Sequence, residues 1–292
     1  MNWLPELDNT AMPSGCLYVV GMPIGNLKDV TLRALDVLNE ADLILAEDTR
    51  NTLRFLTHYD IKTPLEAFHE HNEAPKTQKI VERLQAGKVM ALVSDAGTPC
   101  VSDPGYRLVA AVVAAAVRVI PIPGASAAIT ALSASGMPSD GFVFASFLPR
   151  KSGKQKAMLE RLASYRETLI FYESPKRVRE MLLALQDVLG DRPAVLAREV
   201  TKLYEEMIRG TISEIITELD LRNSIKGECT VIVAGNVDET TEITDAIMAQ
   251  IRTALAEKES VSQMAKRLAE ETNVSKKKIY DCALDIKKEM EI

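Results

Sequence analysis

Short apolar segments and helical patterns alternate along most of the chain, and this alternation limits the folds that the chain can adopt. In the first 120 residues, apolar runs typical of buried strands are separated by segments whose apolar residues recur at helical spacing. The predicted strands lie at 16–20, 43–46, around Glu66, at 89–93 and at 117–120, and the predicted helices at 31–40, 74–85 and 104–116. Alternation of this kind predicts a mainly parallel sheet with helices on both faces.

The rest of the chain divides into two further parts. Pro121-Ile122-Pro123-Gly124 breaks the pattern, and a second α/β unit follows it. Its predicted strands lie near 142–147, 168–172, 194–198 and 229–234, and its helices near 152–163, 175–188 and 211–221. Beyond Gly235 there are three helical stretches, with Ser260 and Ser275 as candidate N-caps and a helix-turn-helix rhythm. We therefore predict a flexible tail at 1–14, α/β domains at 15–122 and 123–238, and a helical helix-turn-helix-like domain at 239–292.

Composition restricts the class of protein. With 292 residues, 47% of them hydrophobic, the chain can bury two domain cores. Its formal net charge of −6 argues against general nucleic-acid binding, so any RNA contact must come from local basic patches. The four cysteines lie far apart without a C-x-x-C pair, and neither a signal peptide nor a membrane span is recognisable. These features predict a cytoplasmic protein with free thiols.

Two glycine-bearing turns directly follow predicted strands. One is Gly21-Met22-Pro23-Ile24-Gly25-Asn26, and the other runs from Ser94 to Pro99 and continues to Gly105. Neither carries the dinucleotide G-x-G-x-x-G fingerprint or a P-loop. Such turns expose backbone N–H and C=O groups at strand carboxyl ends, where open α/β sheets bind ligands. They favour a ligand with an amino-acid part and an adenosine part, while a purely structural turn stays an alternative.

Polar residues follow several other predicted strands. Glu47-Asp48-Thr49-Arg50 suits substrate orientation or base chemistry, and equally an N-cap at Asp48 or Thr49. Polar residues also end the predicted strands at Phe171 to Arg177 and at Arg198-Glu199 with Lys202, and Lys226-Gly227-Glu228 precedes the last strand. Several polar strand ends in succession indicate a ligand crevice.

Two charged segments have alternative interpretations. Arg150 to Lys156 holds four cations in seven residues at a loop-to-helix junction, which favours anion binding, although a solvated helix start is as plausible. The same two interpretations apply to Lys276, Lys277 and Lys278. His69-Glu70-His71 lacks a third obvious ligand, so no metal site is predicted.

As an ordered set, these segments resemble a known family. The matching motifs are Pro23-Ile-Gly-Asn-Leu27, Ala46-Glu-Asp-Thr-Arg50, Ser94-Asp-Ala-Gly-Thr-Pro99, Asp103-Pro-Gly105, Phe171-Tyr-Glu-Ser174, Arg198-Glu199 and Lys226-Gly-Glu228. They resemble the ribosomal RNA small-subunit (16S rRNA) cytidine-2′-O-methyltransferases, a branch of the tetrapyrrole (corrin/porphyrin) methylases. The resemblance spans residues 16–235, and the helical tail also fits.

The resemblance implies a fold, a reaction and partners. The fold would be the two-domain α/β fold of the tetrapyrrole methylases (class III S-adenosylmethionine methyltransferases), with a small C-terminal helical domain. S-adenosylmethionine would bind in the cleft between the domains, without a metal. The substrate would be the ribose 2′-hydroxyl of a cytidine in the decoding region of 16S rRNA, within the small ribosomal subunit. The protein would be a homodimer.

The resemblance also implies roles for individual residues. Those that would contact S-adenosylmethionine are Pro23, Ile24, Ala96, Gly97, Thr98, Val101, Ser126, Ala127, Glu173, Glu199 and Val200. Met22 stands where the family often has threonine, and Lys176 where histidine is common, so these two positions carry no assigned role.

Catalysis and RNA binding need further residues. Positioning of the 2′-oxygen supplies roughly 7–11 kcal/mol of the barrier in well-oriented reactions, and a nearby carboxylate would accept the proton. The candidate bases are Asp48 and Asp95, with Glu173 behind them. The candidate RNA-binding residues are Arg50, Arg150, Lys151, Lys154 and Arg177.

Three other functions compete with this interpretation. A methylase of the same superfamily acting on a tetrapyrrole or on a modified protein histidine is the nearest. A non-catalytic RNA- or nucleotide-binding assembly factor is the second, and the strand-end carboxylates argue against it. A doubly wound dehydrogenase lacks its glycine fingerprint.

Overall fold

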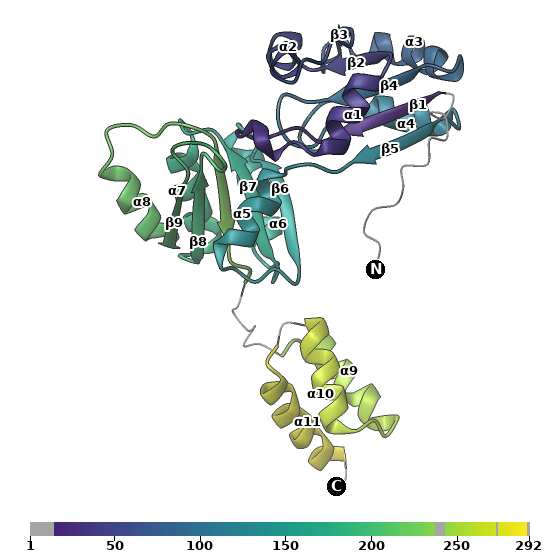
Figure 1. Ribbon diagram of the computed structural model, residues 1–292. Helices are drawn as coiled ribbons and strands as arrows, with labels where there is room; N and C mark the ends of the chain where they lie inside the picture. Colours follow the sequence, from purple (N-terminus) through teal and green to yellow (C-terminus); the bar gives the residue numbers. More distant parts are fainter. Residues whose placement is uncertain (1–14, 237–242, 273, 291–292) are drawn as a thin grey trace, which may run out of the picture. The chain divides into compact units, whose positions relative to one another are not determined.

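The computed structural model describes residues 15–236, 243–272 and 274–290, and the chain divides into two compact units between Gly235 and Asn236 (Figure 1). The predicted tail at 1–14 lies outside the described residues. No helix among the described residues is long and apolar enough to cross a membrane.

The first sheet of the N-terminal unit is wholly parallel, with strand order β3-β2-β4-β1-β5. Its strands are β1 (Cys16–Val20), β2 (Leu43–Ala46), β3 (Leu65–Ala67), β4 (Val89–Val93) and β5 (Arg118–Ile122). The helices that alternate with them are α1 (Leu32–Glu40), α2 (Thr49–His58), α3 (Glu73–Gln85) and α4 (Tyr106–Ala114), with a short 3-10 turn, η1 (Leu27–Asp29). The predicted parallel sheet is confirmed.

Alternation of side chains along the strands explains why both faces are covered. Tyr18 and Ala91 belong to the core under α1 and α2, whereas Leu17 and Leu92 belong to the core under α3 and α4. Successive strand residues point to opposite faces, so a strand that is apolar throughout needs helices on both sides. The fully buried strand β4 is the clearest case.

Two predicted boundaries in this sheet are wrong. The helix predicted at 104–116 begins only at Tyr106, because Gly105 has a φ of 125° and ends the preceding loop. The strand predicted at 117–120 continues through Pro121 and Ile122, which pair with β1. Proline is tolerated there because β5 is an edge strand that has no neighbour on its outer side.

The second sheet of this unit has strand order β6-β7-β10-β8-β9 and is mixed. Its strands are β6 (Phe142–Phe147), β7 (Thr168–Glu173), β8 (Pro193–Arg198), β9 (Glu206–Thr211) and β10 (Cys229–Val233), and its helices are α5 (Ala127–Ser135), α6 (Ser152–Leu162), α7 (Val178–Leu189) and α8 (Ile212–Asp220). Only β6 and β7 are parallel. The α/β character is as predicted, but α5 and β9 are additional elements.

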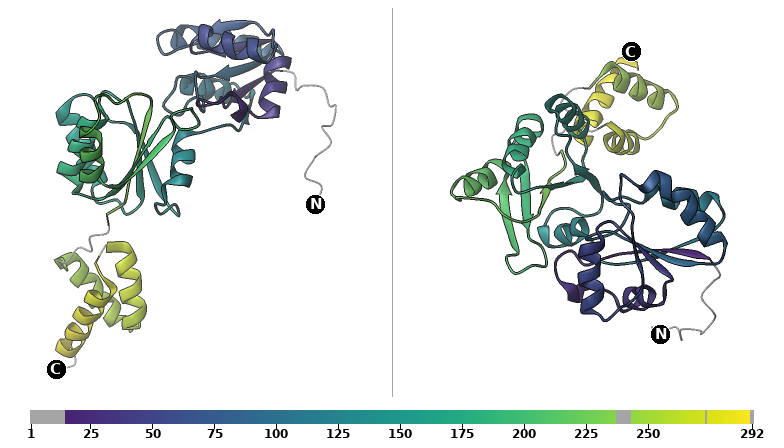
Figure 2. Two further views of the ribbon diagram at one scale, coloured as in Figure 1. Left: turned by 60° about the vertical axis from the view of Figure 1, so that its left-hand side comes forward. Right: turned by 90° about the horizontal axis from the view of Figure 1, so that it is seen from above.

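The two faces of the second sheet are covered differently. Helices α6, α7 and α8 pack on one face, where Leu159, Leu182 and Ile215 join the core. Helix α5 alone packs on the other through Ala128, Ala131 and Leu132. Figure 2 shows α7 and α8 on the side of this sheet away from α5. The α5 face is therefore covered by one helix, and Phe147 at the end of β6 remains exposed.

The C-terminal unit is a bundle of α9 (Asp245–Ala256), α10 (Val261–Thr272) and α11 (Lys276–Met290) with its own core. The three predicted helices are confirmed. The Ser275 hydroxyl accepts a hydrogen bond from the Lys278 N–H at 3.2 Å, and the Ser260 carbonyl accepts one from the Gln263 N–H at 3.0 Å. Both serines therefore stand where the sequence predicts helix starts.

Candidate active site

The glycine turns of the first sheet are joined to one another at its carboxyl edge. Met22 and Gly97 exchange two backbone hydrogen bonds, of 2.8 and 3.1 Å, which link the turns after β1 and β4. Gly21 and Gly124 lie so close that a Cβ on Gly21 would be 2.8 Å from the Gly124 Cα. Only glycine permits this approach, so these positions hold three loops together.

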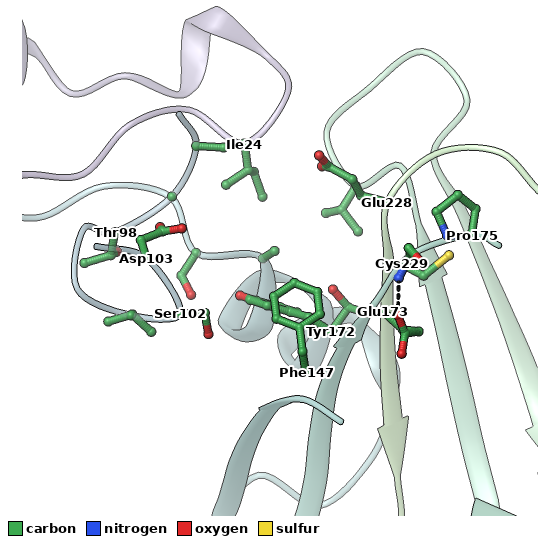
Figure 3. Close-up of a pocket in the computed structure, with 18 residues that line it drawn as sticks. Ile24, Thr98, Ser102, Asp103, Phe147, Tyr172, Glu173, Pro175, Glu228 and Cys229 are labelled. Carbon is green, nitrogen blue, oxygen red and sulfur yellow. Dashed lines mark hydrogen bonds between the residues drawn. The ribbon is translucent and has the colours of Figure 1, made fainter. Parts of the chain in front are cut away.

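These loops and the strand ends of the second sheet enclose a cavity of about 330 Å³, called here the first cavity (Figure 3). The residues implied for S-adenosylmethionine line it, except Pro23 and Glu199; they are Ile24, Ala96, Gly97, Thr98, Val101, Ser126, Ala127, Glu173 and Val200. Segments far apart in the sequence are therefore gathered around one space.

Aromatic side chains that sequence reasoning missed form one wall of the first cavity. The Tyr172 ring lies 4.8 Å from Phe144 and 5.7 Å from Phe147 between centroids, and its hydroxyl accepts a hydrogen bond from the Ala128 N–H at 3.0 Å. Figure 3 shows the Phe147 and Tyr172 rings across the cavity from Ile24. Phe147 is 52% exposed, which is unusual for phenylalanine and leaves an apolar surface for a ligand.

Glu173 lines the same cavity, and its side chain is almost fully buried. Its Oε1 accepts a hydrogen bond from the Ser174 N–H at 2.7 Å, whereas Oε2 is buried without a hydrogen-bond partner. The Arg177 guanidinium lies 3.4 Å from Oε2, as an ion pair without hydrogen-bond geometry. The structure places Arg177 beside this carboxylate.

Three carboxylates, Glu47, Asp95 and Asp103, lie near one another in the segments that follow β2 and β4. Burial, and next the charge of Glu47, raises the pKa of Asp103 to about 6, against an opposing hydrogen bond from Ser94. Burial also raises the pKa of Glu47, whose Oε2 accepts from the Asp95 N–H at 3.5 Å. Asp103 itself lines the cavity. Its motif is recognisable in sequence, but its burial is not.

Asp48 and Asp95 have different environments. Asp48 is the N-cap of α2 and pairs with Arg50 at 2.6 Å, and hydrogen bonds from Arg50 lower the Asp48 pKa to about 2. Asp95 accepts hydrogen bonds from the Asp48 N–H at 3.2 Å and from the Asn51 Nδ2 at 2.9 Å. Asp48 lines neither the first cavity nor a second cavity that adjoins it, whereas Asp95 faces the second cavity.

The second cavity, of about 340 Å³, adjoins the first and shares Ile24, Ala96 and Glu228 with it. Pro23, Asn51, Phe55, Asp95 and Lys202 are among its other lining residues.

Glu199 lines neither cavity and instead supports the rim of the second. Its carboxylate accepts hydrogen bonds from Lys202 Nζ at 2.8 Å and from the Glu228 N–H at 2.9 Å.

Comparison with known proteins identifies the family. Residues 16–216 match the model for tetrapyrrole (corrin/porphyrin) methylases. A protein of Streptococcus pyogenes serotype M3 named ribosomal RNA small subunit methyltransferase I is 46% identical over 270 residues, covering 91% of this chain and 94% of its own length. The chain belongs to the ribosomal RNA small subunit methyltransferase I family.

Other members and more distant structures agree with this assignment. The family member of Bacillus subtilis is 44% identical over 273 residues, covering 91% of this chain and 93% of its own length. The family member of Halalkalibacterium halodurans is 49% identical over 222 residues, covering 76% of each chain. The cobalamin biosynthetic enzyme cobalt precorrin-4 methyltransferase shares the fold at a TM-score of 0.56 and 16% identity, over 75% of this chain and 94% of its own. Uroporphyrin-III-C-methyltransferase from Thermus thermophilus shares the fold at a TM-score of 0.51 and 22% identity, with the same coverage of both chains. The predicted tetrapyrrole-methylase fold and methyltransferase class are therefore confirmed.

In this methyltransferase I family member, the basic side chains predicted to contact RNA fall into two groups. Arg150, Lys151 and Lys154 are exposed around the start of α6. Arg50 and Arg177 are instead paired with carboxylates, Arg50 with Asp48 and Arg177 with Glu173. The α6 cluster thus has the accessibility that phosphate contacts require.

His69 and His71 of this family member lie in the loop between β3 and α3, whereas His58 is the last residue of α2. The His69 Nε2 lies 3.0 Å from the Asn72 Nδ2, and the His69 and His71 rings are 6.0 Å apart between centroids. Across the parts of the chain that the structure describes, no three histidine, cysteine, aspartate or glutamate side chains are grouped to hold a metal ion.

Proposed function

We propose that the protein transfers a methyl group from S-adenosylmethionine to the ribose 2′-hydroxyl of a cytidine in the decoding region of 16S rRNA, within the small ribosomal subunit. The observation that carries the proposal is the first cavity, which gathers the strand-end loops of both sheets around one apolar, aromatic-walled space. The relatives named as small subunit methyltransferases support the choice of substrate.

The residues of the first cavity fit a methyl donor that is part nucleoside and part amino acid. Glu173 would contact it, and Phe147 with Tyr172 would pack against its flat ring. The joined turns at Gly97 and Ile24 would contact its other side. When bound, the sulfonium group of S-adenosylmethionine supplies an electrophilic methyl carbon. The protein's part is to exclude water and to orient the acceptor oxygen.

Asp95 is the proton acceptor in this proposal. It faces the second cavity next to Ala96, a residue common to both cavities, and two donated hydrogen bonds fix its orientation. Asp48 is less suited, because a carboxyl with a pKa of about 2 accepts protons poorly. Glu173 would serve in donor binding.

The exposed cations around the start of α6 would hold the RNA backbone. Lys151 occupies the N-cap position of α6, where N–H groups also attract anions. We expect the assembly to be a homodimer that acts in the cytoplasm, where ribosomal subunits are found.

The test is methyl transfer from labelled S-adenosylmethionine to small subunits isolated from cells that lack the protein, with a porphyrinoid as the competing acceptor. The proposal expects label in ribose of the small-subunit RNA and none in the porphyrinoid. Label in the porphyrinoid alone, or in a base, would contradict it. Undiminished transfer by Asp95→Ala protein would remove Asp95 as the base, and the Asp48→Ala protein tests the other candidate.

A further inference from the structure

The second cavity has no role assigned to it by the family match, and its position suggests one. It shares Ile24, Ala96 and Glu228 with the proposed donor cavity, so a group bound in it lies next to a group bound in the first. We propose that the second cavity holds the acceptor cytidine, and that Glu228 and Lys202 recognise the hydrogen-bonding edge of its cytosine. This inference rests on the proposed function.

The size and walls of the second cavity suit one nucleoside. Its volume is about 340 Å³, close to that of the proposed donor cavity. Met22, Ile24 and Phe55 give it an apolar wall, and Asp95 with Asn51 a polar one. RNA bases that are recognised in sequence are splayed out of the stack, packed on apolar or aromatic groups and hydrogen-bonded along their edges. A cavity of mixed walls beside the reacting atoms matches that mode.

Glu228 and Lys202 present an acceptor and a donor side by side. The Lys202 Nζ lies 3.0 Å from the Glu228 Oε2 and 2.8 Å from the Glu199 Oε1, which leaves one ammonium proton for a ligand. The Glu228 side chain is 78% exposed, so its second oxygen is accessible. Figure 3 shows Glu228 at the upper side of the first cavity, the side on which Ile24 lies.

Glu199 holds the Lys202 ammonium group and the Glu228 backbone in place. Glu199 accepts hydrogen bonds from both Lys202 and the Glu228 N–H, and it donates its own N–H to the Glu228 carbonyl at 3.0 Å. The turn that carries Glu199 and Lys202 has positive φ at Glu199 and Thr201, of 50° and 69°. A backbone held in this sparsely populated region is typical of functional sites.

The loop after β1 closes against Lys202 from the other side. A Cβ on Gly25 would lie 2.4 Å from the Lys202 Cγ and 3.0 Å from the Thr201 Oγ1. Glycine at position 25 therefore lets the first sheet's loop pack on the Lys202 stem. That contact fixes the ammonium group at the cavity wall.

The order of donor and acceptor distinguishes cytosine from uracil. Cytosine offers an amino donor, which carboxylates accept, beside a ring acceptor suited to an ammonium donor. Uracil has a carbonyl oxygen in place of the amino group, and this oxygen would face the Glu228 carboxylate. It also has a ring N–H in place of the ring acceptor, and this N–H would face the Lys202 ammonium group. A site whose donor and acceptor are paired by the correct base and left unpaired by the wrong one discriminates between the two.

The experiment compares methyl transfer to small subunits that carry either C or U at the methylated position. The variants are Glu228→Gln and Lys202→Met, and the control is Asp187→Asn, an exposed charge on α7 that lines neither cavity. Losing one good base contact costs about 1–3 kcal/mol, or roughly 5- to 150-fold. We expect wild type and Asp187→Asn to prefer C strongly. Both cavity variants should lose kcat/KM on C by that factor and show a smaller C-to-U ratio.

Two arms separate this inference from the proposed function. Calorimetry with S-adenosylhomocysteine reports the first cavity independently, and we expect Lys202→Met, which lines only the second cavity, to bind it as wild type does. An unchanged C-to-U ratio in Lys202→Met and Glu228→Gln overturns the inference while leaving the proposed function intact. If wild type methylates neither subunit, the proposed function fails. If the Glu228→Gln protein loses S-adenosylhomocysteine binding, the C-to-U ratio of the Lys202→Met protein alone decides whether the inference holds.

Discussion

At the scale of single residues, Asp103 carries the clearest dependence on pH. Its pKa is raised from 3.8 to about 6, first by burial and then by the charge of Glu47. An acid whose pKa rises on folding binds its proton more tightly in the folded state. The folded state therefore loses stability as the pH rises from about 4 to about 6.

The Asp103→Asn variant removes this loss, because an amide does not ionise. We expect its melting temperature to exceed that of wild type by more at pH 7 than at pH 4, measured by scanning calorimetry in the same buffer series. Equal differences at the two pH values would show that Asp103 is not destabilised by ionisation.

Asp95 is the residue on which turnover is expected to depend most. General base catalysis contributes typically about 10²- to 10⁴-fold, so Asp95→Asn should lower kcat by a factor in that range. The side chain lines only the second cavity, so the affinity for S-adenosylhomocysteine should change little. Steady-state kinetics on small subunits and calorimetry check the two parts. A kcat within threefold of wild type would exclude Asp95 as the base.

Some of these residues could be predicted from the sequence and others could not, for a physical reason. The turns at Gly21 and Gly97 are recognisable because glycine and proline at a strand end signal an unusual backbone locally. Phe147 and Tyr172 follow the pattern of core strand residues, and only the tertiary structure shows that they face a cavity. The placement of Glu199 depends on the distant Glu228 segment, which no local pattern reveals.

At the scale of elements, helix α4 begins without a side-chain cap of its own. Its N-cap is Gly105, and the free N–H groups of Arg107 and Leu108 are instead bound by the Glu73 carboxylate of α3, at 3.1 and 3.4 Å. Glu73 is 6% exposed. This arrangement places a negative charge at a helix N-terminus, where it is stabilising.

The Glu73→Ala variant should therefore be clearly destabilised. It leaves buried N–H groups unsatisfied, at a cost of about 1–3 kcal/mol. Urea unfolding would measure this as a lower midpoint with an unchanged slope. Glu82→Ala, on the exposed side of the same helix, is the matched control. A midpoint equal to that of the control would rule out Glu73 as the cap of α4.

The elements of the first sheet follow from the sequence better than those of the second. A parallel sheet buried on both faces needs continuous apolar strands, such as Val89–Val93, which stand out. Strand β9 is an edge strand with mostly half-buried residues, and its sequence Glu-Met-Ile-Arg-Gly-Thr shows no strong pattern. Helix α5 is rich in alanine and serine, so its apolar face is weakly marked.

At the scale of the whole molecule, both cavities belong to the N-terminal unit. The residues that line them all lie between Met22 and Thr230, and the C-terminal unit has a separate core. A protein ending at Asn236 should therefore bind S-adenosylhomocysteine with the affinity of the full chain. Calorimetry on both proteins checks this, and a weaker affinity of more than tenfold in the shorter protein would mean that the helical unit contributes to donor binding.

The central claim is that this methyltransferase family member places a methyl group on one cytidine ribose of the small-subunit RNA. The most direct measurement is a map of ribose methylation in that RNA from cells lacking the protein, compared with cells that regain wild type or Asp95→Ala. We expect one 2′-O-methylcytidine in the decoding region to be missing from cells that lack the protein. It should return when the cells regain wild type and stay missing when they regain Asp95→Ala. An unchanged map in cells lacking the protein would contradict it.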